Sequence, residues 1–114
     1  MAMQDYYQQL YLWRLQTMVN KKVVYPEWTE SFSDKALVEI SFTTDLEGNL
    51  QNVANKTPEV SSVLVQAVVS SILLALKESQ RPADLEGNRW SFTIRYHFNT
   101  SNTQVVYLPK PQEP

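Results

Sequence analysis

The sequence has 114 residues, of which 43% are hydrophobic and 11% aromatic, and its formal net charge is −2. This length suits a single domain, and the apolar content is enough to fill a core, which argues against a disordered chain. The near-neutral charge argues against a nucleic-acid-binding surface, which would need a basic stripe. Because cysteine is absent, disulfides, thiolate catalysis and cysteine-based zinc sites are excluded.

The first element expected is a helix from Gln4 to Asn20. Its apolar side chains recur every three or four positions, which is the period of a helix. The main stripe consists of Tyr7, Tyr11, Leu15 and Met18, widened by Leu12 and Val19. A second stripe consists of Tyr6, Leu10 and Trp13. It either packs on the loop that follows Pro26 or contacts a partner, and the sequence leaves both open.

Three strands are expected after this helix. In residues 36–44, Ala36, Val38, Ile40 and Phe42 alternate with residues that face the other way. Turn residues at 45–49 connect this strand to a second one, 50–55, in a hairpin. The last strand, 90–99, alternates in the same manner. The pentapeptide Asp-Leu-Glu-Gly-Asn occurs at 45–49 and again at 84–88 with unrelated flanks, so we interpret it as two independent turns.

A second helix is expected from Thr57 to Ser79, with Thr57 as its cap and Pro58 at its first position. Apart from one narrow polar strip its residues are mostly apolar, so we expect other elements to cover most of its sides. Its most apolar stretch, Val63 to Leu76, is shorter than the roughly 20 residues that span a bilayer.

This order of elements predicts an α+β fold, a three-stranded antiparallel sheet packed with two helices. The expected strand order is second, first, third, with the second helix buried along one face at Val68 and Ile72. We assign residues 1–103 to the domain and 104–114 to a C-terminal tail. Residues 104–108 are a candidate for a short fourth strand that folds back over the exposed edge of the sheet. Deletion of the tail is then expected to expose that edge to a partner.

Several short motifs follow one another along the chain: Lys21-Lys22, Tyr25-Pro26, Ala36-x-Val38-x-Ile40-x-Phe42, Glu47-Gly48-Asn49, Arg81-Pro82 and the strand Thr93–Phe98. Together they resemble the periplasmic C-terminal domain of the TonB/TolA energy-transducing proteins. Ala36 stands where this family usually has glycine. The cysteine pair that is usual in the TolA branch is absent, which favours the TonB branch.

The resemblance implies a non-catalytic domain in the periplasm, with the full-length protein anchored in the inner membrane. A proton-driven motor complex there would act through a region upstream of this sequence. The domain would bind an extended peptide of an outer-membrane TonB-dependent transporter by strand addition and transmit force to it. The alternative is a TolA-like or other structural adaptor subunit of a Gram-negative envelope assembly. We expect no cofactor, no metal and no nucleic-acid partner, and an unpaired edge leaves a strand-exchanged dimer open.

The partner-binding residues that follow from this resemblance are Tyr25, Pro26, Thr93, Arg95, Tyr96, His97, Phe98 and Asn99. At a sheet edge, the outward N–H and C=O groups of the last strand can pair with an added strand. Arg95 and His97 would tune which peptide fits, whereas the apolar side chains of this strand belong to the core. No catalytic residue is assigned, because His97 is the single histidine and the carboxylates of Asp45 and Glu47 lie in a turn.

Overall fold

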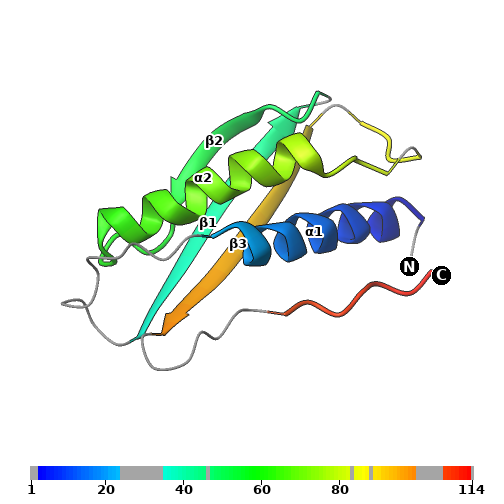
Figure 1. Ribbon diagram of the computed structural model, residues 1–114. Helices are drawn as coiled ribbons and strands as arrows, with labels where there is room; N and C mark the ends of the chain where they lie inside the picture. The colour runs from blue at the N-terminus through cyan, green and yellow to red at the C-terminus, as the bar shows by residue number, and fades with distance from the viewer. Residues whose placement is uncertain are drawn as a thin grey trace.

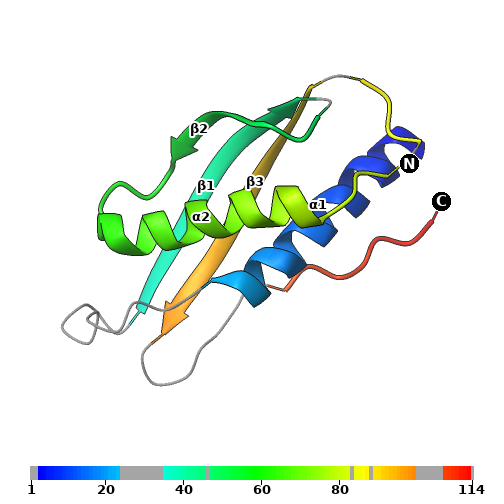
Figure 2. The ribbon, with the colours of Figure 1, turned by 45° about the horizontal axis from the view of Figure 1, so that its top comes forward.

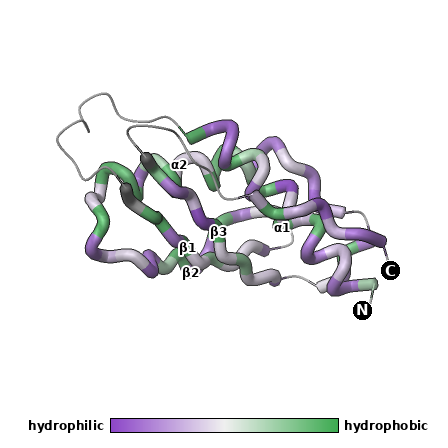
Figure 3. Tube along the Cα trace, turned by 90° about the horizontal axis from the view of Figure 1, so that it is seen from below, coloured by the Kyte–Doolittle hydropathy of each residue, from purple (hydrophilic) through white to green (hydrophobic). Residues whose placement is uncertain are grey.

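A computed structural model describes residues 3–23, 35–45, 47–82, 84–87, 89–99 and 107–113. The elements follow in the order α1 (Met3–Lys22), β1 (Lys35–Asp45), β2 (Leu50–Asn55), α2 (Ser62–Glu78) and β3 (Arg89–Asn99). The strands form one antiparallel sheet in the order β2-β1-β3. Both helices lie on the same face of this sheet (Figures 1 and 3). The predicted α+β fold and its strand order are confirmed.

The core lies between the two helices and the face of the sheet that they cover. Alternate side chains of β1 and β3 point into it, as the period of two predicts. The sheet supplies Val38, Ile40, Phe42, Trp90, Phe92, Ile94, Tyr96 and Phe98. From α2, Val68 is 0% exposed and Ile72 is 1% exposed, so the prediction that this helix is buried along one face is confirmed.

The N-terminus of α2 differs from the prediction, because Ser61 and not Thr57 is its cap. The Ser61 Oγ accepts a hydrogen bond from the Val63 N–H at 3.4 Å. Thr57 instead forms hydrogen bonds with residues of the sheet. Its N–H donates to Asn55 Oδ1 at 2.9 Å, and its Oγ1 accepts from the Glu39 N–H at 3.1 Å. With its hydroxyl turned toward β1, Thr57 is not available to cap a helix.

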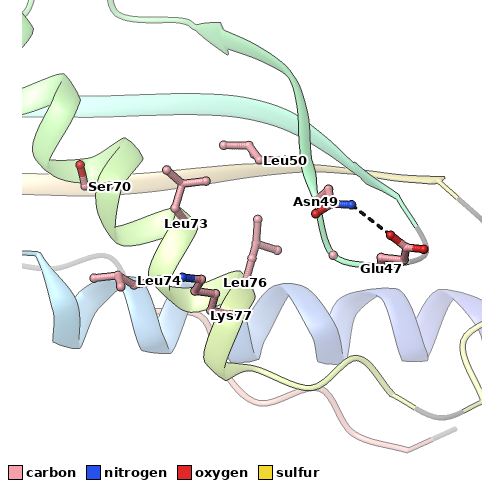
Figure 4. Close-up of a pocket in the computed structure, with 9 residues that line it drawn as sticks. Glu47, Asn49, Leu50, Ser70, Leu73, Leu74, Leu76 and Lys77 are labelled. Carbon is pink, nitrogen blue, oxygen red and sulfur yellow. Dashed lines mark hydrogen bonds between the residues drawn. The ribbon is translucent and has the colours of Figure 1, made fainter.

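The outer face of α2 is less covered than predicted. Leu73 is 49% exposed and Leu74 is 45% exposed, because three strands and α1 cover only one side of the helix. Both line an open cleft of about 750 Å³ between α2 and the β1–β2 turn, with Leu50 on its opposite side (Figure 4). Neither helix in the described part of the chain is long and apolar enough to cross a membrane.

The two copies of the repeated pentapeptide are held by different partners. Both glycines have positive φ, 82° at Gly48 and 98° at Gly87, a conformation that other residues rarely adopt. In the first copy, the carboxylate of Asp45 accepts hydrogen bonds from backbone N–H groups of the turn. In the second copy, the side chain of Gln4 donates to the Asp84 C=O at 2.9 Å and accepts from the Glu86 N–H at 2.8 Å. These environments fit two independent turns.

The described part of the C-terminal tail, residues 107–113, runs alongside α1 (Figures 1 and 2). The Nζ of Lys110 lies 5.5 Å from the centroid of the Trp13 ring, and Leu108 lines a hollow together with these two residues. The second stripe of α1 therefore contacts the tail at Trp13, a packing that the sequence did not suggest. Of the candidate fourth strand, Tyr107 and Leu108 are not in a strand, and the rest lies outside the described residues.

Candidate functional site: the outer edge of β3

The strand β3 pairs with β1 along its whole length, from Lys35 opposite Asn99 to Asp45 opposite Arg89, without interruption. In an antiparallel pair, residues alternate between those that bond to the neighbouring strand and those whose N–H and C=O point away from it. The N–H and C=O of Arg95 both bond to α1, so they point away from β1. By this alternation, Thr93 and His97 also point their backbone groups outward. These two positions have no partner for the N–H among the described residues.

One side chain of α1 occupies this edge at a single position. The Oε1 of Gln16 accepts from the Arg95 N–H at 3.2 Å, and its Nε2 donates to the Arg95 C=O at 2.7 Å. The same Nε2 donates to Asn20 Oδ1 at 3.0 Å, and Gln16 is only 2% exposed. Gln16 was not among the residues that the sequence assigned to partner binding. A signal existed, because Gln16 lies four residues after Leu12 and three before Val19, inside an apolar helical stripe.

The side chains of Thr93, Arg95 and His97 lie on the face of the sheet away from the helices. The hydroxyls of Thr93 and Ser41 share a hydrogen bond of 2.9 Å, and Arg95 forms an ion pair with Glu39 directly across the strands. His97 lies opposite Leu37, whose side chain is 42% exposed. The open face therefore offers polar groups next to one exposed apolar side chain.

A hollow of about 460 Å³ lies against this strand and reaches from α1 to the open face. Leu12 of α1 lines it together with Ser91, Thr93 and Arg95 of β3, and residues of the other two strands complete it. The hollow thus lies beside the middle of β3, next to Thr93 and Arg95.

The other residues that the sequence assigned to partner binding lie elsewhere. Tyr96 is 4% exposed and Phe98 is 1% exposed, and their rings pack together in the core with centroids 4.7 Å apart. Burial raises the pKa of the Tyr96 hydroxyl, and Tyr107 adds to that effect. Asn99 ends the strand, whereas Tyr25 and Pro26 lie outside the described residues.

The described residues offer little for metal or acid–base chemistry. Across residues 3–23, 35–45, 47–82, 84–87, 89–99 and 107–113, no three histidine or acidic side chains are close enough together to hold a metal ion. The pKa of Asp45 is lowered by hydrogen bonds from the backbone and side chain of Asn49 and from the backbone of Glu47. This carboxylate therefore stays charged and stabilises the turn between β1 and β2.

Comparison with known proteins gives one structural match. No protein-family model matches the sequence, and no curated protein matches it either. Among solved structures, the fold is similar to the solution structure of the C-terminal domain of TonB from Helicobacter pylori, with a TM-score of 0.55 and 22% sequence identity. The alignment covers 75% of this chain and 91% of that domain. At this identity the match shows a TonB-like fold and does not separate the TonB branch from the TolA branch.

Proposed function

We propose that this chain is a non-catalytic energy-transducer domain of the periplasm, which binds an extended peptide of an outer-membrane transporter by strand addition. The observation that carries the proposal is the regular edge strand β3, which pairs with β1 on one side and turns the N–H groups of Thr93 and His97 outward. Main-chain hydrogen bonds to such an edge provide affinity, and alternate side chains provide specificity. The TonB-like fold supports this choice.

In the bound state, the added strand lies beside β3 with its backbone groups opposite Thr93, Arg95 and His97. The side chains of these residues flank every second peptide residue on the open face, where Arg95 and His97 select among peptides. Tyr25 and Pro26 contribute a further contact. β3 pairs with β1 over 11 residues. A force applied along the peptide is therefore shared by all the hydrogen bonds between these strands, instead of breaking them one after another from one end. This geometry suits force transmission.

The remaining parts of the proposal concern the whole protein. The full-length chain is anchored in the inner membrane, and a proton-driven motor complex acts on its N-terminal region. Two copies of the domain can also exchange edge strands, because the same edge that accepts a peptide accepts another chain.

A second candidate function is a TolA-like or other adaptor role in an envelope assembly. The observation that favours it is the cleft beside α2, where Leu73 and Leu74 are each exposed by nearly half. Contiguous exposed apolar side chains mark protein-interaction surfaces. In this case the partner contacts α2 and leaves β3 unchanged.

Titration of the ¹⁵N-labelled domain with synthetic peptides from the N-terminal segments of outer-membrane transporters tests the choice between these functions. We expect the amide signals of Thr93, Arg95 and His97 to shift, with smaller changes in α2. Shifts confined to Leu73 and Leu74 support the adaptor role. Shifts confined to α1, with β3 untouched, contradict both.

A further inference from the structure

The contact between Gln16 and Arg95 has the form of a strand pairing. A residue of an added antiparallel strand opposite Arg95 accepts from its N–H and donates to its C=O. The primary amide of Gln16 carries one acceptor and one donor, and it makes both of these bonds, at 3.2 and 2.7 Å. The side chain therefore occupies the place of the N–H and C=O of one residue of the incoming strand.

We propose that Gln16 competes with the added strand, so that a peptide must displace its amide from Arg95 before pairing there. This inference rests on the proposed function, since it names a residue that regulates access to the same edge. A binding site that is free for only a fraction of the time has its affinity reduced by that fraction. Gln16 thereby lowers the affinity of the β3 edge for any strand, including a second copy of this domain.

The positions on either side of Arg95 explain how displacement begins. The outward N–H groups of Thr93 and His97 have no partner among the described residues. A peptide can pair at these positions first and then exchange with the Gln16 amide between them. Because Gln16 also donates to Asn20, its side chain keeps one hydrogen-bonding neighbour on α1 near the released position. The exchange replaces two hydrogen bonds with two others of the same kind.

A purely structural role, fastening α1 to the sheet, is the competing explanation. However, α1 is held at other points along its length. Near its N-terminus, Gln4 bonds to the loop before β3, and in its middle Arg14 Nη1 donates to the Gln80 C=O at 3.2 Å. At its C-terminus, Lys22 forms an ion pair with Glu78 at 3.1 Å. These contacts do not involve Gln16, so its replacement is expected to leave the fold intact.

The test compares Gln16→Ala with Gln8→Ala, the same substitution at an exposed position of the same helix. We expect Gln16→Ala to bind the transporter N-terminal peptides about tenfold more tightly than the unaltered domain. The reason is that the peptide no longer has to displace the two hydrogen bonds between Gln16 and Arg95. Without peptide, the Arg95 amide of this variant should exchange with solvent at least about tenfold faster, because its acceptor is gone. The Gln8→Ala domain should match the unaltered protein in both measurements.

A second variant, Gln16→Glu, keeps an acceptor for the Arg95 N–H but loses the donor to its C=O, so its peptide affinity should be intermediate. It also tests the inference if Gln16→Ala fails to fold. Equal or weaker binding by a folded Gln16 variant overturns the competition, as does unchanged exchange of the Arg95 amide in a folded Gln16→Ala domain. Absence of binding to every protein, the unaltered domain included, overturns the proposed function and this inference together. The two failures are thus distinguishable.

Discussion

The sheet has two edge strands, and each is protected from indiscriminate pairing in a different way. β2 has six residues, and its register with β1 shifts between Ser41 and Thr43. At this irregularity Asn52 has a φ of 52°, in the left-handed region. A bulge of this kind twists an edge and disrupts the template for a further strand. β3, in contrast, has 11 residues and an unbroken ladder, and the side chain of Gln16 covers it at Arg95.

The difference lies in how easily each protection is removed. The bulge of β2 is part of the backbone and persists as long as the strand is folded. The pairing of Gln16 with Arg95 depends on a single side chain, so a change of its rotamer releases the edge without unfolding the strand. A permanently blunted edge and a reversibly covered edge therefore coexist in one small sheet, and the reversible one suits regulated strand addition.

The largest expected effect concerns the packing beneath the two edges. Ile94 on β3 is 0% exposed, whereas Leu50 on β2 is only partly buried beside the core. Replacing Ile94 by alanine should lower the free energy of unfolding by about 3 kcal/mol, and Leu50→Ala should lower it by about 1 kcal/mol. Urea denaturation of both variants measures the difference. A larger loss for Leu50→Ala contradicts our view of β3 as the firmly packed edge.

The next effect concerns the outward N–H of His97, which we expect an added strand to use. His97→Pro removes this donor without removing a bond to β1, because proline is tolerated where the N–H faces outward. We expect peptide affinity to fall by about tenfold, the equivalent of one well-formed hydrogen bond. Calorimetric titration with the transporter peptides measures the loss.

Two controls separate the backbone of His97 from its side chain and from the other edge. His97→Ala keeps the N–H, so its affinity should change less than that of His97→Pro. Val53→Lys places a charge on β2, where Val53 is 46% exposed, and should leave peptide binding unchanged. If Val53→Lys abolishes binding while His97→Pro does not, the peptide pairs with β2 and our assignment of the two edges is reversed.

The smallest expected effect concerns the turn that joins β1 to β2. Hydrogen bonds lower the pKa of Asp45 below its ordinary value of 3.8. A lowered folded-state pKa means that this carboxylate stabilises the fold above the unfolded pKa, and that the contribution is lost as the pH falls through the folded value. Asp45→Asn should therefore reduce stability slightly at neutral pH and have a smaller effect in strong acid. Urea denaturation midpoints of the variant and the unaltered domain, measured at neutral pH and in strong acid, give the change in stability at each pH.

The matched control for Asp45 is Asp84→Asn, the same change in the second copy of the pentapeptide. There the backbone of residues 84 and 86 is held by Gln4. The loss of stability at neutral pH should be larger for Asp45→Asn. An equal loss at both positions contradicts the specific role of the Asp45 carboxylate in fixing the β2 edge.

The sequence predicted β1 and β3 well because burial on one face imposes a period of two, which the alternation of apolar and polar residues reveals directly. The bounds 50–55 were correct, and 36–44 and 90–99 each missed the observed strand by a single residue at one or both ends. Helix starts were harder, since Thr57 and Ser61 are both good caps by residue type. The choice between them depends on the contact of Thr57 with Glu39, which lies on another strand.

The candidate site was predictable only in part. Alternation along β3 indicated which side chains face away from the core, but the direction of the backbone groups depends on pairing with β1. The role of Gln16 depends on the position of α1 beside β3, which residue patterns within a helix do not specify. The exposure of Leu73 and Leu74 likewise depends on how many elements pack around α2. These features come from tertiary packing instead of local periodicity.

Amide hydrogen exchange of the domain with and without a bound transporter peptide tests the central claim most directly. If the peptide adds as a strand beside β3, the amides of Thr93 and His97 gain protection on binding. The amides of Ile94 and Tyr96, which already bond to β1, change little. Protection gained on β2 or in α2, with Thr93 and His97 still exchanging as in the free domain, would contradict the claim that β3 is the binding edge.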